Sequence, residues 1–111
     1  MSKVAKRRAR AASPAERELL DRLNQETAKV QWSELARFFA AGKTIYVAAG
    51  QDLLHVASAA IRDDHRLMQQ LLEHGAVQLV SDQQAQQWHD KDASVWALVV
   101  APWVLVQEDP A

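Results

Sequence analysis

The feature that most constrains this chain is an apolar run that occupies residues 95–106 without interruption. The run is too short for a membrane-spanning helix, which needs about 20 residues, and its β-branched residues and Pro102 disfavour any helix. It therefore predicts β-structure that is buried on both faces. A straight strand of this length would span about 40 Å, too long for a compact domain whose radius of gyration should be about 13 Å. We therefore expect the strand to bend or break at Pro102.

Composition places the chain among ordinary globular proteins. Its 111 residues, of which 49% are hydrophobic and 24% are charged, fit one domain. The sequence contains no cysteine, which excludes disulfides, zinc–thiolate sites, iron–sulfur clusters and thiol catalysis. The N-terminus lacks the apolar core of a signal peptide, and no apolar run is long enough to cross a bilayer. We therefore expect a cytoplasmic protein that does not associate with membranes.

Charge is distributed unevenly, although the net charge is only −1. This asymmetry predicts a basic, disordered arm (1–12), one globular domain (13–107) and a short solvated tail (108–111). The arm either binds nucleic acid without sequence preference, by neutralising phosphates, or only keeps the chain soluble. No RNA-recognition or helix-turn-helix signature accompanies it. The basic residues of the arm are Lys3, Lys6, Arg7, Arg8 and Arg10, and the arm has no acidic residue.

Capping residues and apolar periodicity divide the globular part into five helices. Ser13 and Glu16 form a capping box, so the first helix is expected from residue 14 to about residue 29. Ser33 is expected to cap a short second helix that ends at Gly42. Further caps predict the starts of the last three helices, namely Asp52, Asp64 and Ser81.

Two β-rich segments, residues 44–48 and 77–80, add strands to the C-terminal run. We therefore expect an α+β or small α/β protein, with about five helices packed on a three- to four-stranded sheet and the C-terminal strand buried. In the helix after Asp64, the spacing predicts an inward face formed by Leu67, Met68, Leu71 and Leu72.

Three segments together resemble a known bacterial family. They are residues 24–29 (NQETAK) with 32–35 (WSEL), residues 38–42 (FFAAG) and residues 96–107 (WALVVAPWVLVQ). The chain resembles the family called domain of unknown function 2288 over about residues 16–107, and residues 96–107 are the most specific part. The resemblance implies a complete single-domain protein. It implies no activity, substrate or catalytic residue.

A set of polar and aromatic residues around the end of the first helix is the first candidate site. Asn24 and Thr27 lie on or beside the apolar stripe of that helix, and buried polar groups need hydrogen-bond partners. Either the set forms the floor of a ligand pocket, or its side chains bond nearby backbone and fix the turn to the next helix. The full set is Asn24, Glu26, Thr27, Trp32 and Glu34.

Metal and catalytic chemistry find little support in the sequence. Three Asp–His pairs are closely spaced, but no His-x-x-x-His or Glu-x-x-His pattern accompanies them. The serines are explained as helix caps, and the chain has neither a Gly-x-Ser-x-Gly elbow nor a glycine-rich phosphate loop. We therefore predict no metal, no cofactor and no catalytic residue. The three pairs are Asp52 with His55, Asp64 with His65, and Asp92 with His89.

A protein interface is the remaining candidate, because the C-terminal run has two apolar faces. A one-residue bulge at Pro102 would put Trp96 and Trp103 on one face. Either the helices cover both faces, or one face or a strand edge meets another subunit through Trp96, Trp103 and Leu105.

Three functions follow from these candidates. The first is a non-enzymatic cytoplasmic protein that acts through protein contacts, with a homodimer as one form. The second is a small-molecule-binding protein or minor enzyme with a pocket near Asn24, Thr27, Trp32 and Glu34. The third is a nucleic-acid-associated accessory protein that uses the basic arm.

Overall fold

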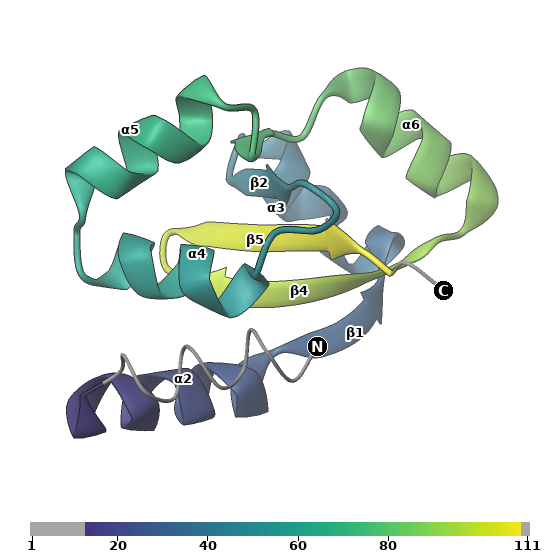
Figure 1. Ribbon diagram of the computed structural model, residues 1–111. Helices are drawn as coiled ribbons and strands as arrows, with labels where there is room; N and C mark the ends of the chain where they lie inside the picture. Colours follow the sequence, from purple (N-terminus) through teal and green to yellow (C-terminus); the bar gives the residue numbers. More distant parts are fainter. Residues whose placement is uncertain (1–12, 110–111) are drawn as a thin grey trace.

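The computed structural model describes residues 13–109, so the predicted basic arm lies outside the described residues. Five α-helices, one 3-10 helix and five strands alternate in this part of the chain (Figure 1). In chain order they are α2 (Pro14–Glu26), β1 (Ala28–Gln31), η1 (Trp32–Leu35), α3 (Ala36–Ala40), β2 (Thr44–Val47), α4 (Leu53–Ile61), α5 (His65–Glu73), β3 (Val77–Leu79), α6 (Asp82–Lys91), β4 (Ser94–Val100) and β5 (Trp103–Glu108).

The five strands form one mixed sheet in the order β1-β4-β5-β2-β3. Strand β5 lies in the middle, antiparallel to β4 and parallel to β2. The remaining neighbours, β1 with β4 and β2 with β3, are antiparallel. The predicted α+β class is therefore confirmed, with five strands instead of three or four.

The apolar C-terminal run breaks at Pro102, as its length predicts. Strands β4 and β5 form a hairpin in which Val100 pairs with Trp103 across the turn. The molecule measures 42 × 28 × 23 Å, so an unbroken strand would have crossed its whole length. Strand β5 continues to Glu108, one residue beyond the predicted end of the globular domain.

Helices cover both faces of the sheet and create two hydrophobic cores. The first core lies under α2 and α4, with Leu98 and Leu105 of the hairpin at its centre. The second core lies under η1, α3 and α6, and contains Val104 and Val106. Figure 1 shows α4 in front of β4 and β5 and α3 behind the sheet. Because successive side chains of β4 and β5 point to opposite faces of the sheet, each strand contributes residues to both cores.

The sequence does not predict strand β1, because its pattern extends the first helix to about residue 29. Helix α2 ends at Glu26, and both the backbone N–H and the hydroxyl of Thr27 donate to the carbonyl of Leu23. The next four residues pair with β4. The predicted cap at Ser33 is also wrong. The backbone N–H of Gln31 instead donates to the Glu34 carboxylate, at 3.2 Å.

The other predicted helix ends are confirmed. Ser13 and Glu16 form the capping box, and the side chains of Asp52, Asp64 and Ser81 accept hydrogen bonds from the first turns of α4, α5 and α6. Gly42 follows α3 with a φ of 73°, a conformation in which a side chain would be strained.

Candidate functional site

Helix α5 is an amphipathic helix that contains no buried residue. Its Leu72 is 53% exposed. Leu71 packs against the first core as a partly buried side chain. Leu72 lies on the predicted inward side, because it lines the space between α5 and the sheet, but it is left uncovered there. An amphipathic helix whose apolar face stays partly uncovered has lost the burial that normally stabilises it.

The space under α5 is an apolar groove of about 400 Å³, called the groove below. Sheet residues line one side, and α5 with the end of α4 lines the other. The lining from the sheet includes Ile45, Val77, Val100, Trp103 and Leu105, and the lining from the helices includes Ala60, Met68 and Leu72.

Charged side chains lie on the helix side of the groove and beside Trp103, which lines its sheet side. On the helix side, Asp63 and His65 lie in the α4–α5 turn, with Nε2 of His65 3.2 Å from Oδ2 of Asp63. Asp63 has a φ of 58°, which aspartate tolerates better than most residues. On the sheet side, Nζ of Lys43 lies 5.2 Å from the centre of the Trp103 ring. Asp63 on the helix side is thus acidic and contacts His65, and the cation of Lys43 lies beside Trp103, which lines the sheet side.

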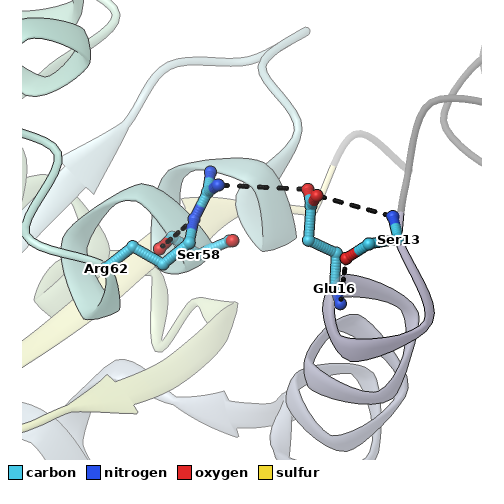
Figure 2. A network of polar contacts seen from close by, with 4 residues as sticks. All are labelled: Ser13, Glu16, Ser58 and Arg62. Carbon is cyan, nitrogen blue, oxygen red and sulfur yellow. Dashed lines mark hydrogen bonds and ion pairs between the residues drawn. The ribbon is translucent and has the colours of Figure 1, made fainter.

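A polar network fixes the end of α4 that leads into this turn. In Figure 2, Arg62 reaches from α4 toward Glu16 of α2. Its guanidinium lies 3.9 Å from the Glu16 carboxylate and its Nε donates to the carbonyl of Ser58. The same carboxylate accepts from the backbone N–H of Ser13. Because Arg62 immediately precedes Asp63, this network helps to hold the charged edge in place.

Two exposed apolar side chains line the groove, and a third lies on the same face of the sheet. Leu72 and Trp103, the latter 36% exposed, line it directly. Leu79, 59% exposed, pairs with Ile45 across β3 and β2 and therefore lies on the same face of the sheet. Exposed apolar surface that lines a groove in this way marks interaction sites in soluble proteins.

The predicted interface residues do not all lie at the surface. Trp103 forms an edge of the groove, as an interface residue should. Leu105 is 2% exposed and contributes only to the groove floor, because it also belongs to the first core. Trp96 pairs with Gln107 near the far end of the hairpin, and Nζ of Lys29 lies 6.0 Å from its ring. Trp96 and Trp103 share a face, but only Trp103 reaches the groove.

The polar set predicted as a pocket is not gathered into one cavity. Asn24 and Glu26 are exposed, and Thr27 and Glu34 bond backbone groups close in sequence. Trp32 is 4% exposed and packs in the second core. The observed contacts are those of a local turn.

A second polar constellation was missed in the sequence, because it depends on Glu108. The Glu108 carboxylate accepts hydrogen bonds from the Tyr46 hydroxyl and from Nε1 of Trp88, each at 3.2 Å. The Trp88 ring lies 4.9 Å from Trp32 and 5.9 Å from Tyr46, measured between ring centroids. The arrangement joins α6 to the end of β5. Burial, together with the charge and the hydrogen bond of Glu108, raises the pKa of Tyr46 above 10.0.

Tyr46 gives a direct test, because it is the only tyrosine of the sequence. In a spectrophotometric titration of the folded protein, tyrosinate should appear with a midpoint above pH 10.0. The raised pKa favours the neutral phenol, so its stabilising effect is complete below about pH 10 and disappears as the pH rises through the folded-state pKa. Glu108→Gln should lower the midpoint, and Glu18→Gln, on exposed α2, should not. A midpoint unchanged by Glu108→Gln would contradict the interaction.

Within residues 13–109, no cluster of three or more His, Asp or Glu side chains could hold a metal ion. Within the same residues, no helix has the length and apolarity to cross a membrane. The titratable groups that line the groove, Asp63 and His65, have side chains at least 80% exposed, an environment that suits recognition at an edge better than buried acid–base chemistry.

Comparisons with known proteins give a family and a related structure. Residues 18–108 match the family model described as "Protein of unknown function (DUF2288)". The solution NMR structure of PA1075 from Pseudomonas aeruginosa is similar, with 36% sequence identity and a TM-score of 0.74. The similarity covers 91% of this chain and 95% of that one. The curated proteins contain no match.

Proposed function

This chain belongs to the DUF2288 family of proteins of unknown function, and we propose that it is a non-enzymatic module that binds a protein partner through the groove. The observation that carries this proposal is the uncovered apolar face of α5 opposite Trp103. Each Å² of apolar surface removed from water contributes about 25 cal/mol. A complex in which a partner fills the groove would therefore be stabilised, because the apolar surface that is exposed in the monomer would be buried.

The residue types of the groove favour a protein partner. Tryptophan and methionine are enriched in protein interfaces, and tryptophan often dominates their binding energy. Here Trp103 and Met68 lie on opposite sides of one groove. The volume of about 400 Å³ also falls in the range of small-molecule sites. However, Asp63 and His65 lie at the solvent-exposed edge of the groove. There they can contact the surface of a protein partner whose apolar side chain is inserted into the groove, which favours a protein over a small molecule.

Photo-crosslinking in cells tests this proposal. A photoreactive phenylalanine analogue is placed at Leu72 in the groove and, as a control, at exposed Gln83 of α6, which covers the other sheet face. We expect a protein adduct from position 72 and none from position 83. Trp103→Ala should reduce the adduct, because it removes the aromatic edge of the groove. Absence of a protein adduct at position 72, or equal adducts at both positions, would contradict the proposal.

A further inference from the structure

We propose that the partner is a second copy of this chain, bound about a two-fold axis so that Lys43 of each copy meets the partner's Asp63. This inference rests on the proposed function, because it requires the groove to be a protein-docking surface. It adds the identity of the occupant and the contacts that set its orientation.

The charges that border the groove are self-complementary. Lys43 lies beside Trp103 on the sheet side, and Asp63 lies in the α4–α5 turn on the helix side. A two-fold axis through the groove exchanges the two sides, so the cation of one copy comes to the anion of the other. A partner of uniform charge would instead meet a like charge on one side. Opposite charges on the two sides of a single groove therefore favour an identical partner.

The apolar surfaces are self-complementary in the same arrangement. The two-fold exchange brings Trp103 on the sheet side of one copy against the helix side of the other, which carries Met68 and Leu72. Trp103 is 36% exposed and Leu72 is 53% exposed, so each side has apolar surface to bury. Methionine adapts its shape to a large aromatic ring.

The size of the protein permits such an interface. The described residues expose 7392 Å², and a standard interface covers about 800 Å² of each partner. The contact would therefore occupy roughly a tenth of the surface, centred on the groove.

Charge reversal with sedimentation velocity tests the pairing. The variants are Lys43→Glu, Asp63→Lys and the double variant. Asp90→Lys on α6 is the control for Asp63→Lys, because it changes the charge by the same sign and amount. We expect the wild type to dimerise and each groove reversal to weaken the dimer about tenfold or more, because like charges then meet at both symmetric contacts. The double variant should return to within about threefold of the wild-type Kd, and the control should leave it unchanged.

The double variant also distinguishes an effect on the interface from an effect on folding. It carries the same strain as Asp63→Lys at a positive φ, so recovery of the dimer cannot come from improved folding. Far-ultraviolet circular dichroism of each variant confirms that it is folded. A wild type that stays monomeric at high concentration overturns the inference, as does a double variant no better than the single ones, or a dimer whose Kd ignores all the reversals. If the position 72 adduct then contains a different protein, the groove still binds a protein and only its assignment to a second copy is lost.

Discussion

Trp88→Ala is expected to lower the free energy of unfolding by about 3–5 kcal/mol. Trp88 is 2% exposed in the second core, and its ring contacts Trp32 and Tyr46. Alanine would leave a cavity under α6 and would remove the donor that holds the Glu108 carboxylate. Since a domain of this kind is stable by only about 5–15 kcal/mol, a large share of its stability would disappear.

Urea unfolding followed by circular dichroism measures this effect. Trp88→Phe keeps an aromatic ring but loses the indole N–H, so its cost should fall between those of Trp88→Ala and the wild type. Gln87→Ala, at the exposed neighbouring position, should change the stability by no more than about 0.5 kcal/mol. A loss below about 1 kcal/mol for Trp88→Ala would show that α6 contributes little to the fold.

Leu98→Ala is expected to cost about 2–5 kcal/mol, the second large effect. Leu98 is 1% exposed at the centre of the first core and pairs with Leu105 across the hairpin. The matched control is Val99→Ala at the next residue, because Val99 points to the other face and is 62% exposed. It should cost less than about 1 kcal/mol.

Both unfolding series should be run at one low protein concentration, because dimerisation would make the apparent stability depend on concentration. Equal losses for Leu98→Ala and Val99→Ala would contradict the assignment of adjacent β4 residues to a buried and an exposed environment. The comparison therefore tests the register of the hairpin as well as its burial.

The sequence predicts the parts of this fold that local chemistry determines. Pro102 cannot continue a paired strand and breaks the apolar run, and Asp52, Asp64 and Ser81 start the helices that follow them. Strand β1 was missed for the opposite reason. Its one β-branched residue, Val30, cannot by itself form the alternating pattern of a strand, and the segment is a strand because β4 lies beside it. Such tertiary pairing is absent from any local pattern.

The candidate groove was predictable only in part. Trp103 could be singled out as an aromatic residue in an unusually apolar run, but the exposure of Leu72 could not. Periodicity assigns Leu72 to the inner face of its helix, and only the distance of α5 from the sheet decides whether that face is covered. The roles of Asp63 and Lys43 depend on the fold in the same way, because they are 20 residues apart in sequence and lie on opposite sides of the groove.

The order of strands in the sheet also has a consequence for synthesis of the protein on the ribosome. Strand β5 lies between β4 and β2 in the sheet but follows every other described strand along the chain. Until residues 103–108 have emerged, β1 with β4 and β2 with β3 are two separate pairs, and neither core can close. The domain therefore cannot complete its fold until β5 has been translated. Until then, the segments already synthesised keep apolar surface exposed.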